Sequence, residues 1–260
     1  MIVLHRPATG PCRPTVHISP DVPTIAGELL AGAIERTIAR QGRCRLALSG
    51  GSTPAPIFAW LRQNLPTRCY DQLHITWADE RVLPCNPSFA GDWQAFDPES
   101  NLRLAYEKWL AHVPIDVRRV HPLALSADAK VETLRFGRSF RQEMDGEIDV
   151  ALLGVGPDGH VASLFPDHPA LDVDDLCMAV HDSPKPPAER ITLSLPVLDR
   201  ARVVVVAATG DNKADMLSNA FAGVNGGEGL PVARVRGGGD LHWVLDPAAG
   251  RQIAAAAISK

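Results

Sequence analysis

The sequence predicts an α/β fold, a three-layer α/β/α sandwich with helices on both faces of a mostly parallel sheet. Two observations lead to this prediction. Short apolar runs rich in branched residues, the pattern of buried strands, alternate along the chain with longer segments of helical periodicity. No internal repeat and no polar linker breaks this alternation, so we expect a single domain over residues 1–260.

Composition excludes several classes of protein. The net charge is −4 and no basic run is present, so we expect no nucleic-acid partner. The 5 cysteines are scattered and form no CxxC pair, which favours reduced thiols over disulfides or a zinc site. The N-terminus lacks the apolar core of a signal peptide, and no stretch approaches the roughly 18 apolar residues of a membrane span. We therefore expect a cytoplasmic protein without a membrane partner.

The first quarter of the chain has clear boundaries between elements. A short strand is expected near Thr15–Ile18, and Asp21 is placed to cap a helix of regular apolar period that Gly42 ends. A buried strand follows at Arg45–Leu48, and Pro54 suits the first position of the next helix.

A glycine turn joins that strand to that helix. Its two glycines allow a sharp turn with exposed N–H groups, and Ser52 or Thr53 is placed to cap the helix. Bare N–H donors, hydroxyls and the positive end of a helix dipole together favour an anion. An ordinary strand-to-helix turn has the same composition and stays open as an alternative. The residues of this candidate phosphate site are Ser49, Gly50, Gly51, Ser52 and Thr53.

A strand expected at Leu73–Ala78 ends in a charged triplet, Asp79-Glu80-Arg81. An arginine at a strand end can bind phosphate or carboxylate through two hydrogen bonds, although a surface ion-pair cluster is the alternative. The segment 82–99 is long and carries Trp93 and Phe96, which indicates either a packed loop or a lid over the site.

The sequence predicts three more elements in the middle of the chain. Ser100 is placed to cap a helix over Asn101–Leu110, Arg118–Leu123 is expected to be a strand, and Ser126 to cap a helix that reaches Met144. Later strands are expected at Arg190–Leu195, Arg202–Ala208 and Leu241–Leu245, with a closing helix at Ala248–Ala257. Lys213 lies in the first turn of a helix, where a cation opposes the dipole, so a bound anion would explain it.

The apolar run Ile148–Leu153 predicts a strand buried on both faces, and a glycine-rich turn follows it. Asp158 and His160 lie in this turn, two residues apart. Ligands of parallel sheets bind beyond the carboxyl ends of the strands, so a carboxylate and an imidazole here form a candidate catalytic site. A tight turn with a capping aspartate is the alternative.

Taken together, these motifs resemble the 6-phosphogluconolactonase family, within the superfamily of glucosamine-6-phosphate isomerases and lactonases. The one departure is the segment between Pro84 and Ser100, which is longer than usual in that family. The matching segments are LALSGGSTP ending at Pro54, ADERVLP (78–84), ESN (99–101), LLGVGPDGHVASLFP (152–166), KPPAERITLSL (185–195), GDNK (210–213) and LHWVLDPAA (241–249).

The resemblance implies a Rossmann-like fold similar to that of glucosamine-6-phosphate deaminase, and hydrolysis of 6-phospho-D-glucono-1,5-lactone without cofactor or metal. His160 would be the base that activates water, with Asp158 orienting it, and amides of the Gly154–Gly159 turn would stabilise the oxyanion. The glycine turn would hold the phosphate, helped by Arg81, Lys213 and Arg190. The partner is then a small phosphosugar lactone, and we expect a monomer or a homodimer.

Two alternatives remain. A sugar-phosphate isomerase-deaminase of the same superfamily would continue after the Asp-Gly-His into a segment with a further carboxylate. Ser163-Leu164-Phe165 stands there instead, and those enzymes tend to lack an arginine at position 81. A non-catalytic sugar-phosphate sensor would usually carry a helix-turn-helix, for which residues 1–20 are too short and proline-rich.

Overall fold

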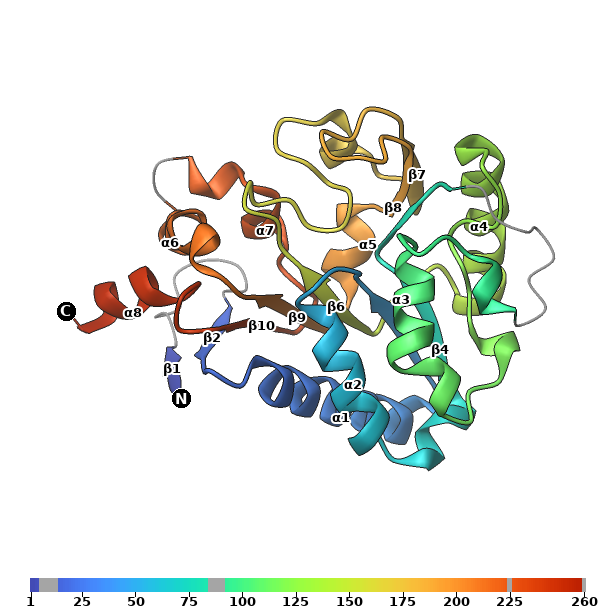
Figure 1. Ribbon diagram of the computed structural model, residues 1–260, viewed down its shortest axis with the longest axis horizontal. Helices are drawn as coiled ribbons and strands as arrows, with labels where there is room; N and C mark the ends of the chain where they lie inside the picture. Colours follow the sequence, from blue (N-terminus) through green and yellow to red (C-terminus); the bar gives the residue numbers. More distant parts are fainter. Residues whose placement is uncertain (5–13, 84–91, 224–225, 259–260) are drawn as a thin grey trace.

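A seven-stranded sheet forms the centre of the molecule, in the order β1-β2-β10-β9-β6-β3-β4. The computed structural model describes residues 1–4, 14–83, 92–223 and 226–258 (Figure 1). Within these, every strand pair of this sheet is parallel except β1–β2. Figure 1 shows α1 and α2 on one side of the sheet and α5 and α7 on the other, which confirms the predicted three-layer fold.

The elements follow the predicted alternation closely. The strands of this sheet are β1 (Ile2–Leu4), β2 (Thr15–Ile18), β3 (Cys44–Leu48), β4 (Leu73–Trp77), β6 (Val150–Gly154), β9 (Val203–Ala208) and β10 (Asp240–Leu245). The helices are α1 (Val22–Gln41), α2 (Pro54–Asn64), α3 (Asn101–Lys108), α4 (Ala129–Met144), α5 (Leu195–Arg200), α6 (Ala214–Ala222), α7 (Pro231–Arg234) and α8 (Arg251–Ile258). All six residues of β9 are buried, as expected of a central parallel strand.

A second sheet, which the sequence did not predict, packs beside the first. It is antiparallel and has the order β5-β8-β7, with β5 (Asp79–Arg81), β7 (Cys177–Val180) and β8 (Arg190–Leu193). The charged triplet therefore does not follow β4 as a loop but forms β5, one residue beyond it. The strand expected at Arg190–Leu195 belongs to this small sheet rather than to the parallel one.

Three of the predicted helix ends are confirmed by their hydrogen bonds. The Asp21 carboxylate accepts the N–H of Thr24 at 3.2 Å, at the start of α1. Gly42 ends α1 with φ 76°, a conformation that glycine adopts without steric cost. The Ser100 hydroxyl accepts the N–H of Arg103 at 3.3 Å, at the start of α3.

Two predictions in the middle of the chain were wrong. Arg118–Leu123 is not a strand: Val120 makes a single parallel bridge to Ile75, and Pro122 follows with no N–H to continue the pairing. Asp128 rather than Ser126 caps α4, because its carboxylate accepts the N–H of Val131 at 3.0 Å.

The start of α2 and the last helix also differ from expectation. The helix begins at Pro54 as predicted, but neither Ser52 nor Thr53 caps it through its side chain. Thr53 Oγ1 instead lies 2.9 Å from Oγ1 of Thr209, on the loop after β9. The closing helix starts at Arg251, three residues later than expected.

The long segment after β5 is described at positions 82–83 and again from Asp92 onward, so Ala90 and the rest of 84–91 lie outside the described residues. In the described part, Trp93 is 7% exposed and stacks on Tyr106 of α3 with ring centroids 4.9 Å apart. Phe96 is 5% exposed and likewise belongs to the core. These two aromatic side chains are packed, which favours the packed-loop alternative over a lid formed by Trp93 and Phe96.

Two further expectations concern the whole chain. In the described ranges, no helix combines the length and the apolar character needed to cross a membrane. The thiols of Cys44, Cys69 and Cys177 are free and buried, while Cys12 and Cys85 lie outside the described residues.

Candidate active site

The candidate site lies where the order of the strands reverses. The chain passes from β3 outward to β4 and then returns to β6 on the other side of β3. At such a reversal the loops after the two neighbouring strands diverge and leave a crevice at their carboxyl ends. The glycine turn 49–53 follows β3 and the turn 155–160 follows β6, so the two predicted motifs meet there.

A pocket of about 210 Å³ opens between these turns. All predicted site residues line it except Asp158, which contacts one of the lining side chains. The sequence reasoning missed Asp79 and Asn101 as lining residues. The pocket is lined by Ser49, Gly50, Gly51, Ser52, Thr53, Pro54, Asp79, Arg81, Asn101, Gly154, Val155, Gly156, His160, Ala162, Arg190 and Lys213.

Asp158 and His160 form a hydrogen-bonded pair, with 2.5 Å between Oδ1 of the carboxylate and Nδ1 of the ring. Burial opposes ionisation of the carboxylate, but the hydrogen bond and charge of His160 and the charge of Lys185 outweigh it. They hold the pKa of Asp158 below its ordinary value. Because an ionised carboxylate only accepts hydrogen bonds, Nδ1 carries the proton of the neutral ring. Nε2 is then the nitrogen that can accept a proton.

The turn after β6 wraps closely around this imidazole. Gly156 N–H donates to the carbonyl of His160 at 2.9 Å, and Gly159 N–H donates to the carbonyl of Gly156 at 3.0 Å. A Cβ added to Gly156 would lie 2.1 Å from the imidazole ring, so only glycine allows the backbone to pass here. The Phe165 ring also packs against the imidazole, with centroids 4.8 Å apart. The position of His160 is therefore fixed by packing.

The turn after β3 presents unsatisfied donors to the pocket. The N–H groups of Gly51, Ser52 and Thr53 have no acceptor among the described residues, as is usual just before a helix such as α2. The Ser49 hydroxyl is buried and likewise has no partner in the described part of the chain. An anion in this cradle would satisfy these donors.

Asn101 connects this turn to β5. Its side-chain amide donates to the Asp79 carbonyl at 2.9 Å and contacts the Asp79 carboxylate at 3.3 Å. A Cβ added to Gly50 would lie 1.8 Å from Oδ1 of Asn101, so glycine permits this close packing. The second residue of the triplet has a different function, because the buried Glu80 carboxylate accepts the N–H groups of Asn101 and Leu102 at 2.9 and 2.8 Å. Glu80 thus stabilises the N-terminus of α3.

Cationic side chains enter the pocket from two sides. Arg81 donates from Nη1 to the carbonyl of Glu99, and its buried Nε has no acceptor among the described residues. Lys213 immediately precedes α6 and is half-buried. Burial lowers the pKa of Lys213, with Asp246 opposing and Lys185 adding to this shift. Both cations are therefore placed to bind an anion in the pocket.

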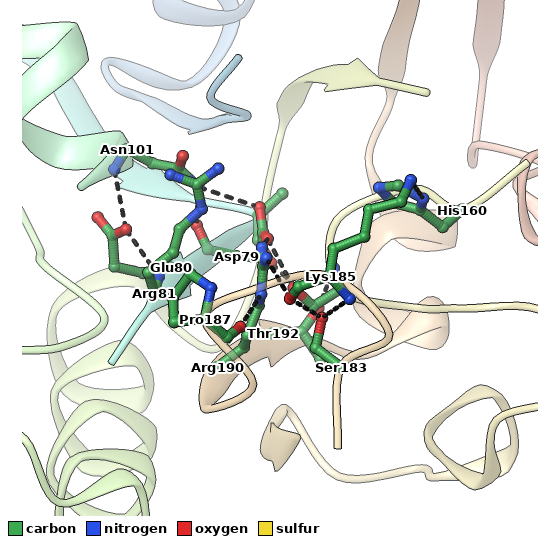
Figure 2. Close-up of polar contacts among 12 residues, drawn as sticks. Asp79, Glu80, Arg81, Asn101, His160, Ser183, Lys185, Pro187, Arg190 and Thr192 are labelled. Carbon is green, nitrogen blue, oxygen red and sulfur yellow. Dashed lines mark hydrogen bonds and ion pairs between the residues drawn. The ribbon is translucent and has the colours of Figure 1, made fainter. Parts of the chain in front are cut away.

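Arg190 lines the pocket, but most of its donors bind backbone. Nε donates to the Pro187 carbonyl at 3.1 Å, and Nη2 donates to the Lys185 and Pro186 carbonyls at 3.1 and 3.2 Å (Figure 2). Nη1 lies 3.7 Å from the Asp79 carboxylate. Arg190 thereby fixes the loop that precedes β8.

Lys185, on that loop, is the functional candidate that sequence reasoning missed. Its Nζ lies 3.4 Å from Oδ1 of Asp158 and 3.3 Å from Nδ1 of His160. The only signal for it was its place in the KPPAERITLSL segment. Among the described residues, no group of three or more His, Cys, Asp or Glu side chains is arranged to hold a metal ion.

Comparisons with known proteins find a matching family, similar sequences and a similar fold. The family described as glucosamine-6-phosphate isomerases/6-phosphogluconolactonase matches residues 21–243. The 6-phosphogluconolactonase of Mycobacterium tuberculosis is 33% identical, over 89% of this chain and 95% of its own. That of Synechocystis sp. is 35% identical, over 85% and 89%. The solved 6-phosphogluconolactonase structure from Trypanosoma brucei superposes with a TM-score of 0.76 at 27% identity, covering 93% of this chain and 99% of that one.

Proposed function

This chain belongs to the family of glucosamine-6-phosphate isomerases and 6-phosphogluconolactonases, and from that premise we propose that it hydrolyses 6-phospho-D-glucono-1,5-lactone to 6-phospho-D-gluconate, a step of the oxidative pentose phosphate pathway. The observation that carries the proposal is the Asp158–His160 pair beside a cradle of unsatisfied N–H donors. A base and an anion site in one pocket are what a phosphorylated ester substrate requires.

His160 acts as the general base. Its Nε2 takes a proton from water, and the hydroxide oxygen bonds to the lactone carbonyl carbon as the carbonyl electrons move to oxygen. When the tetrahedral intermediate collapses, the bond to the ring oxygen breaks and His160 returns its proton to that oxygen. The Asp158 carboxylate, 2.5 Å from Nδ1, stabilises the imidazolium between these steps.

The hydrogen bonds of the turn after β6 support one of its amides as the oxyanion donor. The amides of Gly156 and Gly159 already donate within the turn. Val155 lines the pocket, and its N–H has no acceptor among the described residues. We therefore assign the Val155 amide as the donor from this turn that stabilises the developing negative charge.

The phosphate of the substrate binds in the cradle. The N–H groups of Gly51, Ser52 and Thr53 would donate to its oxygens, and Arg81 and Lys213 would neutralise its charge. Binding the phosphate away from the reacting carbon holds the lactone carbonyl near His160, so part of the binding energy lowers the barrier.

The isomerase-deaminase alternative requires a further carboxylate after the Asp-Gly-His. Ser163 and Phe165 occupy this place, and they bind Asp79 and pack on His160, respectively. No observation favours the sensor alternative.

A coupled assay with freshly generated 6-phosphogluconolactone tests the proposal, with glucosamine-6-phosphate as the competing substrate. The proposal expects release of 6-phosphogluconate well above the spontaneous rate and no formation of fructose-6-phosphate. Deamination without lactone hydrolysis would support the alternative instead.

A further inference from the structure

Lys185 lies beside the catalytic pair although it comes from a distant part of the chain. It is in the loop Ser183–Pro187, just before β8, and its ammonium group contacts both members of the pair. Figure 2 shows the Lys185 side chain extending from this loop toward His160. The lysine side chain is 40% exposed, so its position depends on how firmly the loop is held.

The loop is held by hydrogen bonds to its backbone. Three of its carbonyls, those of Lys185, Pro186 and Pro187, accept from the guanidinium of Arg190, which is only 6% exposed. The Ser183 hydroxyl donates to the Lys185 carbonyl at 2.8 Å and accepts the Lys185 N–H at 3.3 Å. A buried charge with three backbone acceptors fixes this segment far more firmly than an ordinary surface loop. The fixed loop therefore places the ammonium group of Lys185 beside Asp158 and His160.

Of the two contacts that the Lys185 ammonium group makes, only the one with the Asp158 carboxylate is attractive. Nδ1 of His160 carries the proton that it donates to Asp158, so it cannot accept a hydrogen bond from an ammonium group. Oδ1 of Asp158 can accept from both, at 2.5 Å from Nδ1 and 3.4 Å from Nζ. Lys185 thus acts on His160 through the carboxylate.

We propose that Lys185 is a positioning residue that holds the Asp158 carboxylate with Oδ1 toward Nδ1 of His160. In this arrangement Arg190 holds the loop, Lys185 holds the carboxylate, and the carboxylate keeps Nε2 of the ring facing the pocket. The kinetic consequence rests on the proposed lactone hydrolysis, whereas the structural consequence is measurable on the free protein.

The kinetic test uses Lys185→Met, which keeps the length of the side chain and removes its charge. We expect kcat to fall about 10-fold with KM within about two-fold, less than loss of the base itself would cause. Lys185→Arg should recover most of the rate because it keeps the charge. Lys130→Met on the exposed surface of α4 is the matched control and should leave both constants unchanged.

A double-mutant cycle separates action through Asp158 from direct binding of substrate. In an Asp158→Asn background, Lys185→Met should change kcat by less than about two-fold, since the group through which it acts is gone. A full effect in that background, an effect confined to KM, or an unchanged kcat in the single variant would each overturn the proposal.

A measurement without substrate keeps this inference distinct from the proposed function. In the free protein, the Nδ1 proton of His160 should give a low-field proton NMR resonance that is absent in Asp158→Asn. Lys185→Met should broaden or remove it, while Lys130→Met should not. An unchanged resonance in Lys185→Met would overturn the positioning role even if the protein proved inactive as a lactonase.

Discussion

The Ser163 hydroxyl donates to the carboxylate of Asp79 across 2.7 Å, and both side chains are buried. The contact joins the segment just after the 155–160 turn to β5, beside the pocket-lining residues Asp79 and Ala162. Ser163→Ala should lower the free energy of unfolding by about 1–3 kcal/mol, because one oxygen of a buried carboxylate loses a hydrogen-bond donor. Chemical denaturation measures this.

Ser139→Ala is the matched control for that substitution. Ser139 lies on α4, where its hydroxyl bonds an exposed glutamate. Its loss should change stability by no more than about 0.5 kcal/mol. Equal effects of the two substitutions would show that the Ser163–Asp79 contact does not stabilise the fold.

Glu80 is expected to be among the most sensitive positions of the second sheet. Its buried carboxylate accepts from Arg81 N–H at 2.8 Å, Ser100 Oγ at 3.0 Å and the first two amides of α3. Glu80→Ala leaves these donors buried without an acceptor, so the free energy of unfolding should fall by about 3 kcal/mol or more. Glu107→Ala, on the exposed part of α3, serves as control. A loss below about 1 kcal/mol at Glu80 would contradict its role as the anchor of α3.

A half-buried histidine, His74, and a buried one, His121, predict acid sensitivity away from the pocket. Arg119 Nη1 lies 3.2 Å from Nε2 of His74, Nδ1 of His74 lies 3.0 Å from Nε2 of His121, and Nδ1 of His121 lies 2.9 Å from Glu143. Arg119 can only donate and Glu143 accepts, so both rings are neutral with the proton on Nδ1. Burial, the His121 ring and Arg119 lower the pKa of His74 from 6.5 to about 4, and burial lowers that of His121 although Glu143 opposes it.

The direction of the pH effect follows from these shifts. Between pH 6.5 and about 4 the unfolded chain binds a proton at His74 that the folded protein does not. The contribution of neutral His74 to the free energy of unfolding is thus fully present above pH 6.5 and is lost as the pH falls toward 4. The measurement is Tm as a function of pH. His74→Gln should reduce the fall in Tm between pH 6.5 and 4, whereas His112→Gln on the surface should not. Parallel curves for wild type and His74→Gln would exclude the His74 contribution.

Phosphate anchoring predicts substrate selectivity. Charge-assisted hydrogen bonds contribute about 1.5–3 kcal/mol each, so the cradle, Arg81 and Lys213 together should favour the phosphorylated lactone over gluconolactone by on the order of 10³-fold in kcat/KM. Arg81→Ala and Lys213→Ala should each reduce that preference, while Arg62→Ala and Lys108→Ala on exposed helix surfaces should not. If the wild type shows no preference, or both site variants keep it in full, the phosphate assignment is wrong.

Local sequence signals predicted the parallel sheet and the two turns that meet at the reversal of strand order. Apolar runs and glycines report directly on buried strands and on turns after them, which is why His160 and the 49–53 turn were found. The second sheet was missed because β5 is only three residues long and all three are charged, although two of them are buried. In addition, β5 pairs with a strand more than a hundred residues away. Lys185 was missed for the same reason, since only that long-range pairing brings its loop to Asp158.

The N-caps of α4 and α2 could not be predicted from local sequence for a different reason. Ser126 and Asp128 are both good N-cap residues, and local preference does not choose between them. The tertiary structure does, because Ser126 Oγ donates to Glu132 at 2.9 Å and leaves the cap to Asp128. At α2, the Thr53 hydroxyl is drawn to Thr209 on a neighbouring loop, which leaves the N–H donors of the cradle unsatisfied.

The central claim is that His160 is the base for lactone hydrolysis, and steady-state kinetics of His160→Asn with 6-phosphogluconolactone test it most directly. The account predicts that kcat falls by roughly 10²-fold or more while KM changes little, because the phosphate cradle is intact. Asp158→Asn should have an equal or smaller effect, since it supports the imidazole. A folded His160→Asn variant, with wild-type Tm and near wild-type kcat, would contradict the account.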